Sequence, residues 1–224
     1  MSGSIKVPRG QARFASGALA AFALVTLAAG LAAWQKYQLL AGPMAAGPYV
    51  NNPLVEVDTY FRNLTGWRTA LLVMALLQFS LWLANMRDVA DVLWRKGQRR
   101  RRAWLVFGWV IPVAQLFVPK MFVNDLWAAS RPEPQRRRGH PLLAAWWLSV
   151  LIAANAYSGA SADLKKAVSA AQARHALRQI MFSDGLYICA AGMSIVVVWQ
   201  LIRRLERAAA IAPAEVWATG QTTS

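Results

Sequence analysis

The sequence is poor in the residues that build disulfides and metal sites. Its 224 residues include one cysteine, Cys189, and two histidines, His140 and His175. A single cysteine forms no internal disulfide, and the two histidines lie far apart without the neighbouring ligands that a zinc site needs. We therefore expect no metal and no cofactor.

Several catalytic motifs are also missing. The chain has no glycine-rich phosphate loop, no Walker pattern and no Gly-x-Ser-x-Gly turn. Each of these motifs places a backbone or a nucleophile in a geometry that its chemistry requires. Their absence argues against nucleotide hydrolysis, redox chemistry and a serine-type triad.

Acidic residues are few as well. Ten Asp and Glu stand against 25 Lys and Arg, a formal charge of +15. Such a charge could neutralise nucleic-acid phosphates, but the basic residues lie at the edges of apolar blocks, which is typical of membrane proteins. These residues include Arg95, Lys96, Arg99 to Arg102, Arg136 to Arg138, Arg203, Arg204 and Arg207. We expect anionic lipid headgroups as partners and no nucleic acid.

What the sequence does contain is long apolar blocks, each close to the length that crosses a hydrocarbon layer. They are Phe14 to Trp34, Thr69 to Met86, Ala103 to Pro119, Pro141 to Tyr157 and Phe182 to Ile202. The blocks predict an all-α integral membrane protein with one helical membrane domain over residues 14–207. Residues 1–13 are expected to be cytoplasmic and residues 208–224 to form a flexible tail.

The distribution of basic residues predicts the topology. Both termini and the arginine-rich stretch near Arg99 are expected in the cytoplasm of a multi-pass protein of the cell membrane, since positive charge accumulates on that side. A full crossing by the block after Arg102 would move Arg136 to Arg138 outside. Pro112 and Pro119 also disfavour an unbroken helix. We therefore expect four transmembrane helices plus a re-entrant segment over about 103–130, the alternative being five transmembrane helices.

Two connections are expected outside the membrane. Residues 35–65 are predicted to form a long outer loop, which carries Glu56, Asp58 and Tyr60. Residues 159–180, which alternate charged and small apolar residues, are predicted to form a separate amphipathic helix on the outer surface.

The stretch GWVIPVAQLFVP, followed by NDLWAAS, resembles an actinobacterial membrane family of unknown function with the core G-W-x-x-P-x-A-N-L-x-x-P. The resemblance covers roughly Val57 to Tyr157. This chain has Gln115 where the family has Asn, which moves the amide one methylene further out. The resemblance implies a multi-helix membrane protein and assigns no reaction.

Polar residues at membrane depth are costly and indicate a partner or a task. On the cytoplasmic side, candidate ligands for a small cavity are Asn85, Asp88, Gln115, Asn124 and Asp125. On the outer side, Glu56, Tyr60 and Asp184 form a second group, with Arg68 near them. The alternative for each carboxylate is structural: Asp91 can pair with Arg87 or Arg95 at a spacing of four, and exposed acids can simply be solvated.

Two functions from different classes follow. The first is a cavity for a lipid-like or isoprenoid-derived substrate, possibly in a cofactor-independent cyclase of a prenyl chain. Asp88, Asp125, Glu56 and Asp184 would be its candidate acids, and the faces of Trp82, Trp109 and Trp146 would stabilise a cation. The second is a non-catalytic membrane scaffold that binds lipids or a partner, in which the tryptophans pack the core.

Overall fold

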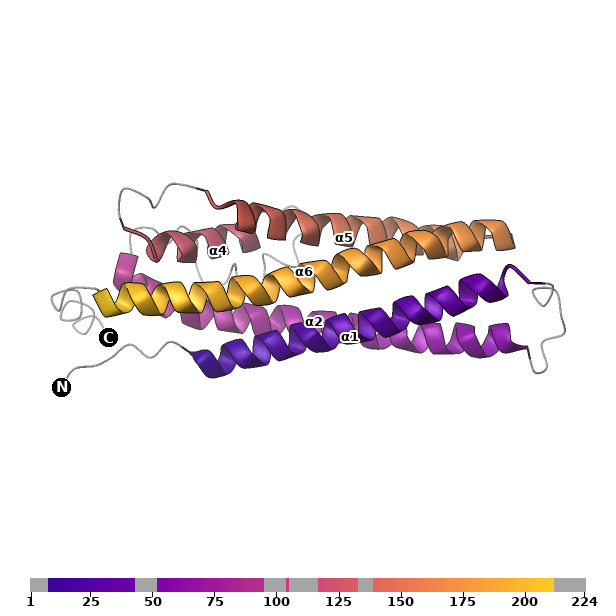
Figure 1. Ribbon diagram of the computed structural model, residues 1–224, viewed down its shortest axis with the longest axis horizontal. Coiled ribbons are helices and arrows are strands. Elements are labelled where there is room, and N and C mark those ends of the chain that lie inside the picture. The colour runs from indigo at the N-terminus through magenta and orange to yellow at the C-terminus, as the bar shows by residue number, and fades with distance from the viewer. Residues whose placement is uncertain (1–7, 43–51, 95–103, 105–116, 133–138, 212–224) are drawn as a thin grey trace. The chain divides into compact units, whose positions relative to one another are not determined.

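The computed structural model describes residues 8–42, 52–94, 104, 117–132 and 139–211. Within these ranges the chain forms five helices and no strand (Figure 1). The helices are α1 (Arg9–Leu39), α2 (Pro53–Trp94), α4 (Val118–Ala129), α5 (Pro141–Lys166) and α6 (Ala170–Ile211).

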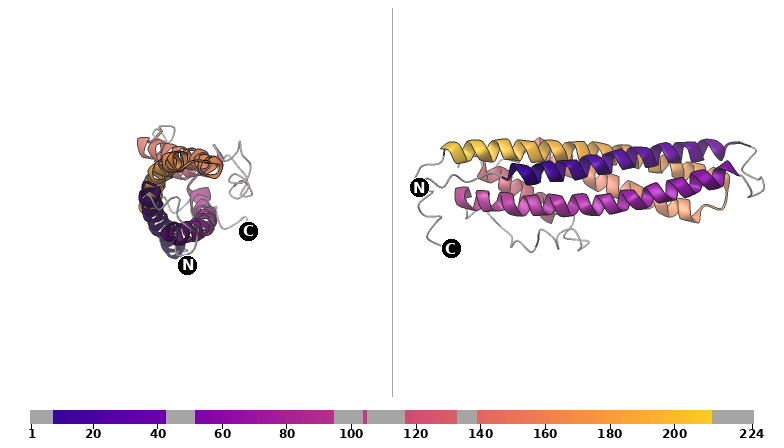
Figure 2. Two further views of the ribbon diagram at one scale, coloured as in Figure 1. Left: turned by 90° about the vertical axis from the view of Figure 1, so that its right-hand side faces the viewer. Right: turned by 90° about the horizontal axis from the view of Figure 1, so that it is seen from below.

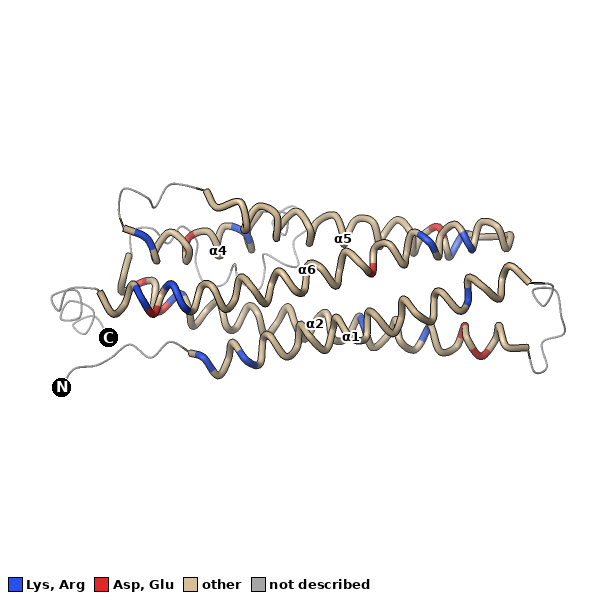
Figure 3. Tube along the Cα trace, viewed as in Figure 1, with Lys and Arg blue, Asp and Glu red and all other residues tan. Residues whose placement is uncertain are grey.

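Four of these helices, α1, α2, α5 and α6, are long and apolar enough to cross a membrane. The predicted all-α fold with four candidate spans is therefore confirmed, and the chain is a multi-pass membrane protein. Figure 3 shows the uncharged middle stretches of α1 and α5. In α1 that stretch runs from Phe14 to Gln35.

Helices α2 and α6 are much longer than a bilayer requires. Each has 42 residues, which at 1.5 Å per residue is about 63 Å, against a hydrocarbon core of roughly 30 Å. Hydropathy marks where a helix can cross, but it does not mark where the helix ends. Helical structure therefore continues outside the hydrophobic core.

The expected long outer loop is wrong in most of its length. α1 continues to Leu39 and α2 already begins at Pro53, so Glu56 lies in the first turn of a helix. The start has a local cause: the Asn52 side chain accepts a hydrogen bond from the Leu54 N–H (2.9 Å), and proline is well tolerated at the first helical position.

The separate amphipathic helix is wrong as well. α5 continues to Lys166 and α6 begins at Ala170, so three residues of turn separate them. Ser169 accepts a hydrogen bond from the Gln172 N–H (3.2 Å), and the Gln172 side chain accepts one from the Val168 N–H (2.9 Å). This reciprocal arrangement resembles a capping box and fixes the start of α6.

Helix α4 is the second half of the expected re-entrant segment. It has 12 residues, or about 18 Å of length, which is too short to cross a bilayer. Pro119 lies in its first turn, where the missing N–H has no intrahelical partner to lose. The first half of that segment, with Trp109, Pro112 and Gln115, lies outside the described residues.

The chain divides into two compact units. Figure 2 gives two further views of the helices that contribute to them. Unit 1 comprises residues 1–17, 75–145 and 194–224, and unit 2 comprises residues 18–74 and 146–193.

In unit 1, polar contacts join helix ends that are far apart in sequence. Arg9 at the start of α1 binds Glu206 near the end of α6 (Nε to Oε1, 2.6 Å). The Asn85 amide of α2 donates to the Gln11 side chain of α1 (2.5 Å). These contacts place the beginning of the first helix beside the end of the last.

In unit 2, segments of α1, α2, α5 and α6 share one small-residue core. Its buried members are Ala32, Ala33, Phe61, Ala160, Leu177 and Ile180. Three of the six are alanines, and small residues at a helix interface allow close backbone approach, the usual basis of helix association in membranes.

Candidate functional site

The most deeply buried charges of the described residues form an ion pair in unit 2. Arg68 of α2 donates from Nη1 to Oδ1 of Asp184 in α6 at 2.5 Å, with side chains 4% and 3% exposed. Arg68 directly precedes the apolar block from Thr69 and Asp184 lies near the start of the block from Phe182, yet both lie well inside their helices. A charge at such depth is stable only with a partner, and each residue supplies that partner for the other.

Aromatic rings surround this buried ion pair. The Arg68 guanidinium carbon lies 3.9 Å from the Tyr157 ring centroid, and Tyr157 contacts Tyr187 edge-on at 6.0 Å. Phe22 meets Tyr187 at 5.6 Å and 88°. A guanidinium over an aromatic face gains electrostatic stabilisation where water is excluded.

The second carboxylate oxygen of Asp184 is buried without a hydrogen-bond partner in the described structure. It lies beside Gly30 of α1, where an added Cβ would be 3.6 Å from Oδ2. That distance is ordinary van der Waals contact, so the backbone of α1 closes this side of the pair. An unpartnered buried oxygen calls for either a structural or a functional explanation.

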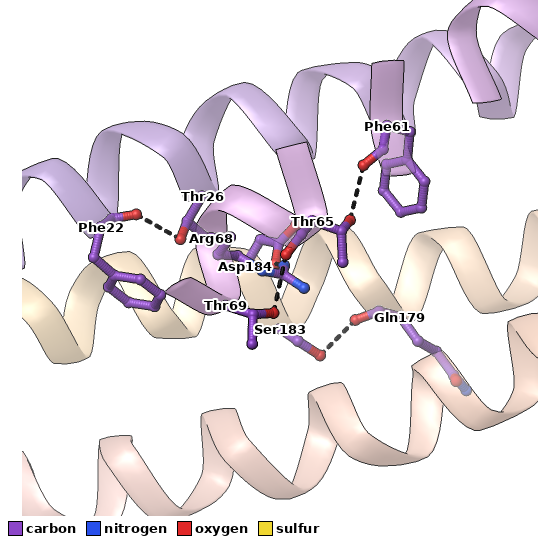
Figure 4. A network of polar contacts seen from close by, with 9 residues as sticks. All are labelled: Phe22, Thr26, Phe61, Thr65, Arg68, Thr69, Gln179, Ser183 and Asp184. Carbon is purple, nitrogen blue, oxygen red and sulfur yellow. Dashed lines mark hydrogen bonds and ion pairs between the residues drawn. The ribbon is translucent and has the colours of Figure 1, made fainter. Parts of the chain in front are cut away.

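Hydroxyl groups near the ion pair are used within their own helices (Figure 4). Thr65 donates to the Phe61 carbonyl (2.9 Å), and Thr69 donates to the Thr65 carbonyl (3.0 Å). Ser183 donates to the Gln179 carbonyl (2.7 Å). Such bonds to the carbonyl four residues earlier satisfy a hydroxyl without any tertiary partner.

Unit 1 holds a different constellation, a basic aromatic cluster made of Trp127, Arg131, His140 and Arg204. The Arg204 and Arg131 guanidinium carbons lie 4.4 Å and 6.0 Å from the Trp127 ring centroid. The His140 ring is 4.5 Å from the same ring. Three basic side chains thus lie around one indole. Arg131 follows α4, His140 directly precedes α5, and Arg204 belongs to α6.

Charge and burial both act on His140. Partial burial disfavours the protonated imidazole, and the positive charges of Arg131 and Arg204 disfavour it further, so the pKa of His140 lies below its ordinary value. Its Nδ1 accepts a hydrogen bond from the Leu142 N–H (3.2 Å). The neutral ring therefore carries its proton on Nε2.

The expected cytoplasmic candidates differ in their surroundings within the described structure. Asn85 is engaged with Gln11, whereas Asp88 and Asn124 are exposed on their helices. Asp125 is buried in α4. Gln115 lies outside the described residues. α4 does contact α2, because the Arg87 guanidinium carbon lies 5.4 Å from the Phe122 ring centroid.

The structural alternative holds for Asp91, whose Oδ1 lies 3.9 Å from Arg87 Nε at the predicted spacing of four residues. Near the start of α2, Glu56 and Tyr60 are exposed. Asp58, their neighbour, binds Lys36 of α1 at 2.5 Å. Glu56 and Tyr60 therefore lie on an exposed helix surface, whereas Asp184 of the same expected group is buried.

Trp82 and Trp146 are fully buried. Trp82 contacts Phe79 at 5.5 Å, and Trp146 contacts Trp147 at 5.4 Å. Their packing is that of core aromatics. Trp109 lies outside the described residues.

The basic aromatic cluster was missed at the level of sequence because its members are separated by long stretches of chain. The available signal was each residue's position at the end of an apolar block, with His140 directly before Pro141 and Arg204 directly after WQLIR.

A family model described as a domain of unknown function, DUF4328, matches residues 54–206. The chain belongs to this family. The matched region runs from the start of α2 to near the end of α6, and α1 precedes it. The expectation of a membrane family of unknown function is thus confirmed at that level. No curated protein and no solved structure matches the chain.

Proposed function

We propose that this member of the DUF4328 family is a non-catalytic membrane scaffold that holds anionic lipid headgroups at its basic end. The observation that carries the proposal is the distribution of charge. Of the 25 Lys and Arg residues, seven lie in the sequence of unit 2 and the other 18 in that of unit 1. Those of unit 2 are Lys36, Arg62, Arg68, Lys165, Lys166, Arg174 and Arg178.

Acidic residues do not offset this difference. Unit 2 has four, Glu56, Asp58, Asp163 and Asp184, and unit 1 has the other six of the ten. The formal charges are therefore +12 for unit 1 and +3 for unit 2, which together make the +15 of the chain. Each Lys or Arg near an anionic surface contributes about 1 kcal/mol of attraction.

The membrane orientation is part of the same proposal. Because positive charge accumulates on the cytoplasmic side, unit 1 with its Arg9–Glu206 contact between the two helix ends would face the cytoplasm. We also propose, from the stretch GWVIPVAQLFVP, that the family is actinobacterial.

The polar interior supports a structural use of buried groups. Arg68 and Asp184 bind each other, and neighbouring hydroxyls donate to carbonyls of their own helices. Apart from the second oxygen of Asp184, these groups have partners within the protein, which favours a structural reason for their presence at membrane depth.

A thermal-stability measurement tests the lipid-binding scaffold. The purified protein would be mixed with phosphatidylglycerol or with phosphatidylcholine carrying the same acyl chains, at low and at high salt. A ligand that binds only the folded state raises the melting temperature, so we expect a larger increase with phosphatidylglycerol that shrinks with salt. Equal increases with the two lipids would overturn the proposal.

The acid-initiated cyclase is a second candidate, favoured by one observation. Asp184 has an oxygen without a hydrogen-bond partner in the described structure, close to Tyr157 and Tyr187. Protonation of a terminal alkene, ring closure through the cation and loss of another proton would be a net isomerisation. Arg68 argues against it, because its guanidinium already binds the other oxygen of Asp184.

The test of this candidate replaces Asp88, Asp125, Glu56 and Asp184 one at a time by Asn or Gln. Membranes containing each variant would be incubated with a linear isoprenoid alkene and analysed for cyclised product by gas chromatography. Loss of product in a variant that is still folded in detergent supports the enzyme. Equal product from all four variants and the wild type removes it.

A further inference from the structure

The basic aromatic cluster gathers positive charge around one indole. The Arg204 and Arg131 guanidinium carbons lie 4.4 Å and 6.0 Å from the same indole ring centroid. The His140 ring lies 4.5 Å from that ring. The charge of Arg131 acts on Arg204, and both charges act on His140, so a bound anion would stabilise the cluster.

Arg204 has no acidic partner among the residues that the structure describes. The acid nearest to it in sequence, Glu206, is bound by Arg9 through two hydrogen bonds of 2.6 Å and 3.0 Å. Arg204 is half-buried, and its guanidinium lies over the face of Trp127. Stacking on the indole orients the guanidinium and leaves its N–H groups for another acceptor.

His140 supplies a second donor. The hydrogen bond from the Leu142 N–H fixes Nδ1 as the acceptor, so Nε2 carries the hydrogen and has no partner in the described part of the chain. The indole Nε1 of Trp127 is likewise buried without a hydrogen-bond partner there, in a side chain that is 2% exposed. Two orphan N–H groups thus belong to the same cluster as two guanidiniums.

The position of the cluster along the chain suggests the source of the anion. Arg204 follows the apolar run SIVVVWQLI of α6, and His140 precedes the apolar run PLLAAWWLSVL of α5. Apolar helix ends lie at the level of lipid headgroups, where tryptophan and arginine are the usual interfacial residues. A phosphate at this level is most simply that of a phospholipid.

We propose that Arg204, His140 and Arg131, arranged around Trp127, bind the phosphate group of an anionic phospholipid. The inference rests on the proposed scaffold function and names its specific headgroup site. Arginine matches the geometry of phosphate oxygens with two parallel N–H donors, and the Nε2–H of His140 adds a third directed hydrogen bond.

The experiment titrates purified protein in detergent with phosphatidylglycerol and counts bound lipid by native mass spectrometry. The variants are Arg204→Gln, Arg131→Gln and His140→Ser, since serine can still cap α5 at that position. Arg203→Gln is the matched control. Arg203 is the exposed neighbour of Arg204 in α6, and has no hydrogen bond or ion pair in the described structure.

We expect Arg204→Gln to weaken phosphatidylglycerol binding by at least about tenfold, as loss of a charge-assisted hydrogen bond does, and Arg203→Gln by less than about twofold. Arg131→Gln and His140→Ser should fall between these limits. Phosphatidylcholine of the same chain length should bind more weakly than phosphatidylglycerol. If Arg204→Gln does not fold, Arg131→Gln and His140→Ser carry the test, and unchanged binding by both overturns the site.

Other outcomes overturn the inference in separable ways. Equal weakening by Arg203→Gln and Arg204→Gln would mean diffuse attraction by the basic end, which leaves the scaffold function intact and removes the specific site. Displacement of the lipid by inorganic phosphate alone would assign the site to free phosphate. Failure of phosphatidylglycerol to stabilise the wild type at all would remove the scaffold function itself.

Discussion

Arg68 and Asp184 show how one interaction can dominate the interior of a membrane helix bundle. Their side chains are 4% and 3% exposed, so removal of either partner leaves an uncompensated charge in an apolar environment. The consequence is an asymmetry between single and double substitutions.

We expect Arg68→Leu or Asp184→Leu to lower the free energy of unfolding by about 3–5 kcal/mol, whereas the double variant recovers most of the loss. Chemical denaturation in detergent would measure all three. Lys36→Gln is the control, because its partner Asp58 is 43% exposed and such pairs contribute under about 1 kcal/mol. A double variant as unstable as the worse single one would contradict this expectation.

The lowered pKa of His140 makes the stability of the folded protein depend on pH. Its pKa is lowered in the folded protein by burial and by Arg131 and Arg204, so the unfolded chain binds the proton more readily. Stability from the neutral ring is fully present above the ordinary histidine pKa of about 6.5. It is lost progressively as the pH falls below that value.

Melting temperatures would be measured in neutral detergent between about pH 5 and pH 8, a range around the ordinary histidine pKa. We expect the melting temperature of the wild type to fall with pH and that of His140→Ser to change less. His175→Ser is the matched control for removal of a histidine, since His175 is exposed and contacts only Gln179 of its own helix. A decline that persists unchanged in His140→Ser would assign the effect to other groups.

Individual residues were predictable from the sequence where the relevant partner is close along the chain. The pairing of Arg87 with Asp91 follows from helical spacing alone. Arg68 and Asp184 stand out as charges beside apolar blocks, but they are 116 residues apart. Their pairing depends on how α2 and α6 rotate and pack, which no local pattern specifies.

At the scale of elements, α4 depends on a single large side chain. Trp127 is 2% exposed and contacts His140 and Arg204, whereas Phe117 at the start of α4 is 61% exposed. Truncation of a buried tryptophan costs about 3–5 kcal/mol. Because α4 is short, that loss should appear first as local opening.

We expect Trp127→Ala to increase hydrogen exchange throughout residues 118–129 while α2 and α6 retain their protection. Phe117→Ala should leave exchange of the same residues nearly unchanged. Mass spectrometry of peptides from each segment would measure both. Equal exchange in the two variants would show that the packing of Trp127 does not hold α4.

The helices themselves were predicted better than their ends. The apolar blocks gave the four candidate spans, but the polar helical extensions before Thr69 and after Tyr157 were taken for a loop and a separate helix. Hydropathy falls where a helix leaves the membrane, whether or not the helix continues. The capping pattern of Ser169 and Gln172 was a readable local signal for the true start of α6.

For the whole molecule, the four-crossing scheme leads to a direct test of topology. The contact between Arg9 and Glu206 joins the two helix ends in unit 1, and the turn between α5 and α6 contains Val168, which is 91% exposed. If unit 1 is cytoplasmic, Gly139 before α5 is inside and Val168 after it is outside.

Single-cysteine variants in a Cys189→Ser background would check this orientation. We expect Val168→Cys to react with a membrane-impermeant maleimide in intact cells and Gly139→Cys to react only after lysis. Neither change should disturb the fold, since Val168 is exposed and a Cβ at Gly139 meets no neighbouring atom. Labelling of Gly139→Cys in intact cells would contradict the four-crossing scheme.

The three-residue turn between α5 and α6 has a consequence for biogenesis. So short a connection holds the polar ends of the two helices, with Lys166 and Arg174 among their charges, at the tip of one hairpin, and we expect α5 and α6 to enter the bilayer together. Deletion of α5 would then leave α6 to insert alone, with its arginine-rich end opposing the orientation imposed by the preceding helices.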